Sequence, residues 1–298
     1  PKEATKIILP IGISFYTFQL LSYVVDVYRK EVAAQPAYWK LLLYCSLFHQ
    51  CIAGPIVRYQ TVAAEIDDRK VTLTDLTNGI RRFSIGLAKK AILANGCASV
   101  ADTLLANTQS ATTAGLWLGM LFYMLQIYLD FSAYSDMAIG VARMLGFKIR
   151  ANFLFPFFST SLRSFWRKWH ISLTSWFTEY LYIACGGSRV SKWRWYFNLA
   201  LVFIVSGIWH GAAWTYIVWG VLHAALYLIE VITKQGQVEP KTTIEATMRG
   251  LLIFILWAIT LTVFRAETLT DAWTMLAHVL SPWGILYTGA SLMSFTLL

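Results

Sequence analysis

Long apolar stretches recur along this chain and predict helices that cross a membrane. A helix needs about 20 residues to cross a hydrocarbon core of about 30 Å, so runs near that length are the informative ones. They lie at residues 7–27, 39–57, 114–145, 195–231, 250–265 and 272–297. A weaker stretch at 80–106 carries basic residues in its first half, as does a helix that enters from the cytoplasmic interface. We therefore expect an all-α, multi-pass membrane protein with a single domain over residues 1–298.

The stretch 195–231 is too long for one simple crossing. It holds enough apolar chain for two short helices, but its only punctuation is Gly207, Gly211 and Gly220. Non-helical backbone at membrane depth survives only when it is packed in protein or lines a wet cavity. The stretch thus predicts broken or tightly turned helices, with His210 at the break.

Composition agrees with the membrane prediction and narrows the function. Apolar residues make up 57% of the chain and charged residues 14%, against roughly 25% charged in soluble domains. The net charge of +9 does not indicate nucleic-acid binding, because no nucleic-acid motif accompanies it and basic residues of membrane proteins gather in cytoplasmic loops. The four cysteines lack the spacing of a metal site or a disulfide framework, so we expect no metal. The chain begins with Pro1 and shows no signal peptide, which is typical of a piece of a longer protein.

Basic residues are concentrated between 143 and 194. Nine of the 25 Lys and Arg lie there against a single acid, Glu179, and the positive-inside rule places this face in the cytoplasm. A helix that starts near Arg163 would carry aromatic residues on one side, from Phe165 to Tyr180, and Arg163 and Arg167 on the other. That pattern predicts an amphipathic helix lying in the membrane interface.

His210 is the first candidate for chemistry. It lies in SGIWHGAAWTYIVWG, where the chain is apolar for more than ten residues on both sides. An ionisable group within a membrane segment is a functional hypothesis by default, and a neutral imidazole can accept a proton from a hydroxyl. The alternative is a histidine that is hydrogen-bonded between helices. His170 lies at the boundary of the basic and aromatic faces, where it could contact an anionic acyl donor or lipid headgroups.

Asp130 and Asp136 are unusual because carboxylates in an apolar stretch are costly unless they are paired. We expect partners among Arg143, Arg58, the hydroxyls of Tyr128 and Tyr134, or His210. A structural ion pair is favoured over a direct catalytic role, and Asp130, Asp136 and Tyr134 are assigned as supporting polar residues. Among the other histidines, His223 is expected to pack between helices.

Five segments together resemble one family, the membrane-bound O-acyltransferases (MBOAT). They are PIGISFYTFQLLSYVVDVYR at 10–29, QCIAGPIVRY at 50–59, YLDFSAYSDMAIGVARMLGF at 128–147, SFWRKWHISLTSWFTEYLYI at 164–183 and SGIWHGAAWTYIVWGVLH at 206–223. The resemblance is nearest to the alginate O-acetyltransferase branch and extends more distantly to proteins that transfer D-alanine to teichoic acid.

The resemblance implies a ring of transmembrane helices with re-entrant and interfacial amphipathic helices around a central funnel. It also implies that the family's N-terminal helices are missing from this ring. By it, His210 matches the family's catalytic histidine and His170 the second functional histidine. The implied reaction passes an acetyl group from cytoplasmic acetyl-CoA to a hydroxyl of a cell-surface polysaccharide or of a periplasmic partner acetyltransferase. Acetyl-CoA is a co-substrate in this reaction and not a bound cofactor. The implied location is the bacterial inner membrane.

Arg163, Arg167, Lys168 and Trp169 are predicted to contact the donor, the basic three through the phosphates of coenzyme A. A second enzymatic hypothesis keeps the fold and transfers a D-alanyl or other acyl group from a carrier protein. A third treats the chain as a conduit or transporter without chemistry, with Asp130, Asp136 and His210 as its polar pathway.

Overall fold

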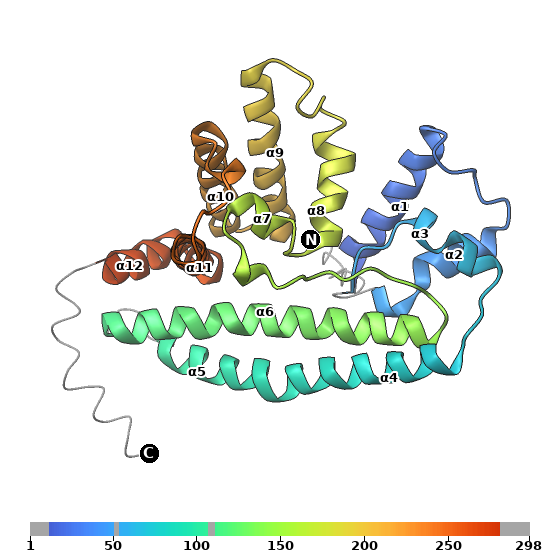
Figure 1. The fold of residues 1–298 in the computed structure, drawn as a ribbon, viewed down its shortest axis with the longest axis horizontal. Helices are drawn as coiled ribbons and strands as arrows, with labels where there is room; N and C mark the ends of the chain where they lie inside the picture. The colour runs from blue at the N-terminus through green and yellow to red at the C-terminus, as the bar shows by residue number, and fades with distance from the viewer. Residues whose placement is uncertain (1–11, 51–53, 107–110, 281–298) are drawn as a thin grey trace, which may run out of the picture. The chain divides into compact units, whose positions relative to one another are not determined.

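The computed structural model describes residues 12–50, 54–106 and 111–280, and every regular element in these ranges is a helix (Figure 1). The chain divides into two compact units and crosses between them several times. Unit 1 holds the described residues up to Ala88 together with 131–152 and 170–176, and unit 2 holds the rest. The all-α prediction is confirmed for the described part of the chain.

Unit 1 is built from short helices around a small core. Its elements are α1 (Ile13–Tyr28), α2 (Tyr38–Ser46), η1 (Phe48–Gln50), α3 (Tyr59–Asp67), α4 (Leu73–Ala88), the second half of α6 (Thr113–Met144) and α8 (Ile171–Phe177) up to Trp176. Tyr44, Val62 and Phe147 are almost fully buried in that core.

Within unit 1, α4 packs closely against α6. An added Cβ at Gly86 would lie 2.7 Å from the carbonyl oxygen of Ala133, and one at Gly140 would lie 2.7 Å from that of Gly79. Neither position could carry a side chain without moving the backbone. Glycine therefore sets the close spacing of these two helices.

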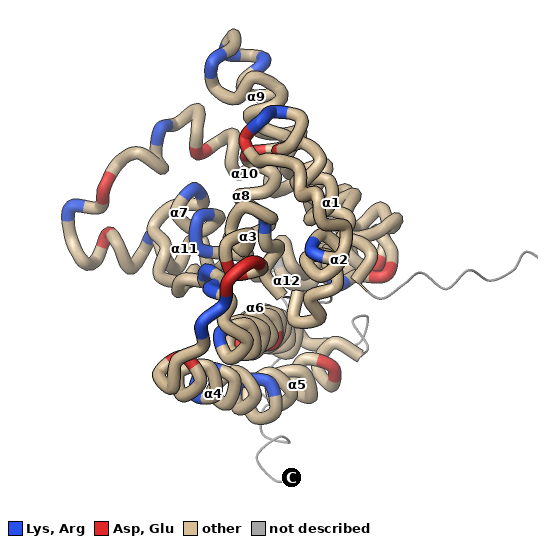
Figure 2. The backbone as a smooth tube through the Cα atoms, turned by 90° about the vertical axis from the view of Figure 1, so that its right-hand side faces the viewer, with Lys and Arg blue, Asp and Glu red and all other residues tan. Residues whose placement is uncertain are grey.

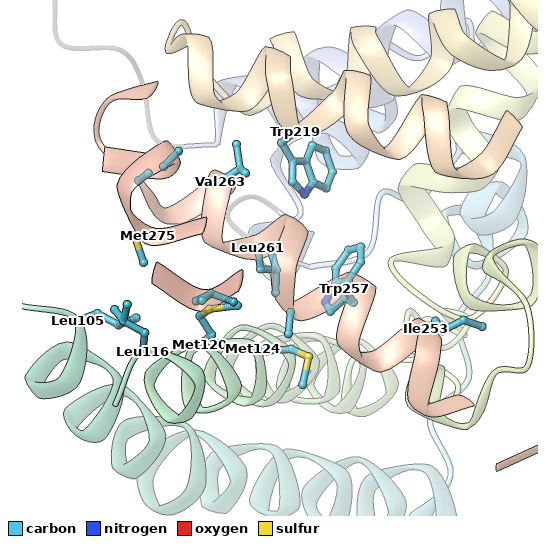
Figure 3. Close-up of a cluster of buried hydrophobic side chains, with 14 of the residues drawn as sticks. Leu105, Leu116, Met120, Met124, Trp219, Ile253, Trp257, Leu261, Val263 and Met275 are labelled. Carbon is cyan, nitrogen blue, oxygen red and sulfur yellow. The ribbon is translucent and has the colours of Figure 1, made fainter. Parts of the chain in front are cut away.

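Unit 2 contains the longer apolar helices. Its elements are η2 (Lys89–Ala94), α5 (Asn95–Leu105), the first half of α6, η3 (Pro156–Phe158), α7 (Leu162–Trp166), η4 (Thr178–Tyr182), α9 (Lys192–His210), α10 (Trp214–Thr233), η5 (Gln235–Gln237), α11 (Thr243–Arg265) and α12 (Leu269–Leu280). Figure 3 shows α11 at the centre of the unit's core: Trp257 approaches Trp219 of α10, and Leu261 approaches Met120 and Met124 of α6.

Three helices among the described residues are long and apolar enough to cross a membrane: α6, α10 and α11. The predicted stretches 114–145 and 250–265 correspond to α6 and α11, and 195–231 divides as expected into α9 and α10. The stretch 80–106 falls on α4, η2 and α5. For 272–297, α12 covers the first part and the remainder lies outside the described residues.

One predicted span is wrong, and a second is described only in part. The stretch 39–57 is not one crossing, because α2 ends at Ser46, Leu47 adopts an extended conformation and only η1 follows. The stretch 7–27 appears as α1, of which the structure describes residues from Ile13.

The prediction of one continuous helix beginning near Arg163 is also wrong. The chain forms two short helices there, α7 and α8, separated by a turn in which His170 has a left-handed backbone with φ of 44°. The amide of Ile171 donates to the carbonyl of Asn152 at 2.9 Å instead of continuing the helix of the preceding residues. The division of faces holds, since Phe165 is buried and Arg163 is exposed, but the aromatic face packs inside protein.

Candidate functional site

His210 is the last residue of α9, at the tip of a helical hairpin. Residues 211–213 make the turn, and α10 begins at Trp214. The sequence prediction that His210 lies at a break in the 195–231 stretch is confirmed. A histidine here stands on a rigid helix yet borders non-helical backbone, where a substrate can approach.

Three glycines allow α9 and α10 to pack closely together. A Cβ on Gly207 would lie 2.4 Å from the carbonyl oxygen of Tyr216, and one on Gly220 would lie 2.6 Å from that of Phe203. A Cβ on Gly211 would lie 2.7 Å from the Tyr216 ring. Gly207 and Gly220 thus admit a neighbouring backbone, whereas Gly211 leaves room for the ring of Tyr216 beside the turn that follows His210.

The imidazole of His210 is half-buried among aromatic rings. Its centroid lies 4.7 Å from that of Trp209, 5.3 Å from that of Trp219 and 5.1 Å from that of Phe264, with the last two rings edge-on to it. Within the described ranges no side chain or backbone group is hydrogen-bonded to the His210 ring, which removes support for the alternative of a histidine bonded between helices. An imidazole without a fixed hydrogen-bond partner is available to a hydroxyl substrate.

A charged residue, Arg265, lies next to the aromatic rings that surround His210. Phe264, which contacts His210, is followed by Arg265, whose guanidinium lies 4.8 Å from the centroid of the Tyr123 ring and 2.9 Å from the carboxylate of Asp102. Sequence reasoning missed Arg265, because its position at the end of α11 reads only as an ordinary helix terminus.

His170 is held in a different way, by hydrogen bonds within unit 1. Its ring is 4% exposed, its Nδ1 lies 3.3 Å from Oδ1 of Asn152, and the ring of Phe131 packs edge-on with centroids 4.6 Å apart. The alternative in which His170 points to lipid headgroups is therefore wrong. The left-handed backbone at this residue is uncommon outside glycine and is a recognised sign of a functionally constrained position.

Asn152, which the sequence analysis did not single out, organises this turn. It is 1% exposed, its Oδ1 accepts the amide of Ser172 at 3.0 Å and its Nδ2 donates to Oγ of Ser135 at 3.2 Å. No local sequence signal identifies it, because its partners are up to 20 residues away in the chain.

The residues predicted to contact the donor lie in and directly after α7, whose basic positions are marked in Figure 2. Arg163 and Arg167 are exposed and Lys168 is half-buried. Trp169 instead packs in the core of unit 2, with its ring stacked on Phe165 at 5.6 Å between centroids. Contact with the donor stays a prediction for all four.

Glu230 of α10 anchors the start of α7. One carboxylate oxygen accepts the backbone amide of Leu162 at 2.6 Å and the other accepts that of Arg163 at 2.9 Å. An acidic group at a helix N-terminus satisfies amides that have no partner within the helix. The bond fixes the exposed basic residues of α7 near the C-terminal end of α10, whereas His210 adjoins its N-terminal end.

Both aspartates of α6 form ion pairs with basic residues that the sequence analysis did not name. Asp136 accepts from Nε and Nη2 of Arg82 at 3.0 and 2.9 Å, and Asp130 lies 2.6 Å from Nζ of Lys90. The basic partners come from the amphipathic 80–106 stretch, which runs beside α6. The expected partner Arg143 instead pairs with Asp75 at 3.3 Å.

The other predicted groups have structural positions. Arg58, a second expected partner, donates to the carbonyl of Ser175 at 3.1 Å. Tyr134 is half-buried on α6. His223 is 2% exposed, with its ring centroid 4.7 Å from that of Trp219 and 5.1 Å from that of Trp257, so the prediction that it packs between helices is confirmed. No three His, Cys, Asp or Glu side chains gather as metal ligands in the part of the chain that the structure describes.

Comparison with known proteins identifies relatives of this chain. It is 41% identical to the probable alginate O-acetylase AlgI of Azotobacter vinelandii over 94% of this chain and 56% of that protein. It is 34% identical to a peptidoglycan O-acetyltransferase of Helicobacter pylori over 91% of this chain and 56% of that protein. It is 30% identical to a teichoic acid D-alanyltransferase of Bacillus subtilis over 72% of this chain and 57% of that protein.

The chain spans about half the length of the curated relatives it matches. The model of the MBOAT family, the membrane-bound O-acyltransferases, matches residues 29–266. That range contains α6, α10 and α11 together with both candidate histidines. The chain therefore belongs to the membrane-bound O-acyltransferase family.

Proposed function

We propose that this protein transfers an acetyl group to a hydroxyl of a cell-surface polysaccharide, or of a periplasmic partner acetyltransferase that completes the transfer. The supporting observation is His210, a half-buried imidazole at the tip of the α9–α10 hairpin in a chain of this family. Relatives named for O-acetylation share more identity with the chain than those named for D-alanylation, 41% and 34% against 30%.

In this proposal acetyl-CoA is the co-substrate and His210 is the general base. The imidazole removes the proton of the acceptor hydroxyl as the oxygen attacks the thioester carbonyl, and the thiolate of coenzyme A leaves and takes up a proton. General-base assistance of this kind contributes on the order of 10²- to 10⁴-fold in rate. His170 takes part in placing the donor.

The ends of α10 suggest how the donor lies along unit 2. Glu230 holds the basic residues of α7 near one end of this helix, and His210 adjoins Tyr216 near the other end. Between Tyr216 and Glu230 the helix rises about 20 Å, at about 1.5 Å per residue. Acetyl-CoA is an extended donor with charged phosphates at one end and the thioester at the other. This shape suits a protein in which the basic residues at α7 and the base His210 lie at opposite ends of α10.

The orientation in the membrane follows from charge. Three helix ends lie on the same side of unit 2: the start of α9, the end of α10 and the start of α11. Basic residues gather there, among them Lys192 and Arg194. We propose that this side is cytoplasmic, in a bacterial inner membrane that the protein crosses several times. His210 and Arg265 then lie toward the opposite compartment, where the acceptor is found.

The conduit hypothesis loses its main support. It required Asp130, Asp136 and His210 as a polar pathway, but ion pairs with Lys90 and Arg82 account for both carboxylates. The carrier-protein hypothesis remains the second enzymatic candidate, and a relative named for teichoic acid D-alanylation favours keeping it under test.

The test is mass analysis of surface polysaccharide from cells with the parental protein, with His210→Ala and with the gene deleted. We expect ester-linked acetyl groups only with the parental protein. Equal acetylation in the deletion strain would refute the function. Parental acetylation by a folded His210→Ala protein would refute the base assignment and leave the function standing.

A further inference from the structure

The hydrogen-bond pattern around His170 fixes which of its ring nitrogens carries the proton. Oδ1 of Asn152 accepts the backbone amide of Ser172 at 3.0 Å, and a backbone amide can only donate. The other side-chain atom, Nδ2, donates to Oγ of Ser135 at 3.2 Å. The orientation of the Asn152 amide is therefore determined by the Ser172 amide, and the Ser135 hydroxyl is compatible with it because a hydroxyl can accept.

The same oxygen lies 3.3 Å from Nδ1 of His170. Because Oδ1 is an acceptor, the favourable partner at this distance is a protonated Nδ1. A neutral imidazole with hydrogen on Nδ1 has its lone pair on Nε2. In that state Nε2 can accept a hydrogen bond or a proton but cannot donate one.

We propose that Asn152 is a positioning residue that holds His170 in the Nδ1–H tautomer, so that the buried Nε2 is left as an acceptor. The inference rests on the proposed function and deepens it. A group of the donor or acceptor that reaches Nε2 must then bring an N–H, O–H or S–H, because a thioester carbonyl would need a donor.

The backbone of the turn serves the same arrangement. Asn152 also accepts the amide of Ile171 through its main-chain oxygen at 2.9 Å, so one residue caps the first two amides of α8. These bonds stabilise the left-handed conformation of His170, which is unfavourable at a non-glycine residue.

Ser172 offers a competing partner. Its Oγ lies 3.5 Å from Nδ1 of His170, a longer contact than that of Asn152. A hydroxyl can both donate and accept, so it does not fix a tautomer by itself. Ser172→Ala therefore separates the two partners.

The primary test is nitrogen-15 NMR of the full protein labelled at its histidine rings, with His170→Gln to assign the His170 signals. We expect Nδ1 of His170 to be protonated and Nε2 unprotonated at neutral pH in the parental protein. The opposite tautomer overturns the proposal, whether or not the protein transfers acetyl groups. This readout is thus independent of the proposed function.

Four variants, Ser172→Ala among them, test the cause. Asn152→Asp keeps an acceptor oxygen and should retain the Nδ1-protonated tautomer and acetyl transfer within a few-fold. Asn152→Leu removes the acceptor and should lose that tautomer, with transfer lowered roughly tenfold to a hundredfold, as for other residues that orient a site histidine. Ser135→Ala removes only the contact to Nδ2 and should keep both. Retention of the tautomer in a folded Asn152→Leu protein, or its loss in Ser172→Ala with Asn152 intact, would contradict the assignment.

Discussion

At the scale of single residues, three of the five histidines of this chain occupy distinct environments. His210 borders aromatic rings and is half-buried, His170 is buried and held by Asn152, and His223 is buried among tryptophans. Burial alone does not separate a catalytic imidazole from a packing one. The difference lies in whether the ring nitrogens are fixed, available to solvent or enclosed.

The first prediction contrasts two histidines that both contact Trp219. We expect His210→Gln to lower acetyl transfer by about 10²- to 10⁴-fold with a melting temperature close to the parental one, because the ring makes no hydrogen bond to a described residue. The measurement is transfer rate together with thermal unfolding in detergent.

His223→Leu is the matched control. Neither ring nitrogen of His223 has a hydrogen-bond partner in the described part of the chain, and an unsatisfied buried polar group costs on the order of 1–3 kcal/mol. We expect this variant to unfold at an equal or higher temperature and to keep its activity. Loss of activity here comparable to that of His210→Gln would show that the assay reports packing and not base catalysis.

A second prediction concerns the ion pairs of α6. The pair of Arg82 and Asp136 is the less exposed, with side chains 36% and 24% exposed against 43% and 41% for Lys90 and Asp130. We expect Asp136→Asn to lower the free energy of unfolding by about 1 kcal/mol and Asp130→Asn by less. A double-mutant cycle between positions 82 and 136 measures the coupling, and a coupling of zero would contradict a structural pair.

At the scale of elements, helix spacing depends on a few glycines. The α9–α10 hairpin brings the backbone carbonyls of Tyr216 and Phe203 within 2.4 and 2.6 Å of where a Cβ on Gly207 or Gly220 would lie. The clashing atoms belong to the main chain, so rotation of a side chain cannot relieve them. The position of His210 at the hairpin tip depends on this packing.

The third prediction follows from those distances. Gly220→Val should lower the free energy of unfolding by about 1–3 kcal/mol through overpacking, and should lower activity because α9 and α10 separate next to His210. The control is Gly96→Ala in α5, where an added Cβ meets nothing within 4 Å and alanine favours the helix by up to about 1 kcal/mol. Thermal unfolding of both variants checks the pair, and equal stability would contradict the close-packed hairpin.

The break between α7 and α8 is the second informative element. The sequence carries a helical aromatic period through residues 163–180, and local propensity alone continues the helix. The bonds of Asn152 to the amides of Ile171 and Ser172 replace two helical hydrogen bonds and place His170 in a turn. A segment in which periodicity and structure disagree is a common position for a functional residue.

At the scale of the whole molecule, the distribution of charge suggests how substrates reach the protein. Exposed basic residues lie on and directly after α7, near the end of unit 2 at which we propose the donor phosphates bind. A charged contact far from the reacting atoms contributes to binding more than to the chemical step. This separates the role of α7 from that of His210.

The fourth prediction uses that separation. The double variant Arg163→Ala and Arg167→Ala should raise KM for acetyl-CoA by roughly tenfold or more while kcat changes little, and the effect should shrink at high salt. A kinetic assay over a range of ionic strengths measures it. As the control, Lys234→Ala removes a basic residue beyond the end of α10 and should leave KM unchanged.

The donor itself is tested by offering acetyl-CoA and an acylated carrier protein side by side. We expect transfer from acetyl-CoA alone. Transfer only from the carrier protein would replace the proposed reaction by the second enzymatic candidate, in which the basic residues of α7 bind an acidic protein surface.

The sequence by itself determined the class of molecule and where its chemistry was to be sought. Apolar runs of span length predicted α6, α11 and the α9–α10 pair, and the isolation of His210 in an apolar stretch marked it as a candidate. These features follow from local composition and periodicity, which the chain carries whatever its partners are. A partner for Asp130 and another for Asp136 were likewise expected, because an unpaired charge in an apolar helix is too costly.

The tertiary structure decided which residues meet. Asp130 pairs with Lys90 and Asp136 with Arg82, because the helices that carry these basic residues run beside α6. Asn152 and Glu230 gained roles at helix starts 20 to 68 residues distant in the chain. Such contacts depend on the packing of helices far apart in sequence, and no local pattern of hydrophobic and polar positions encodes them. For that reason the break at His170 became visible only in the folded chain.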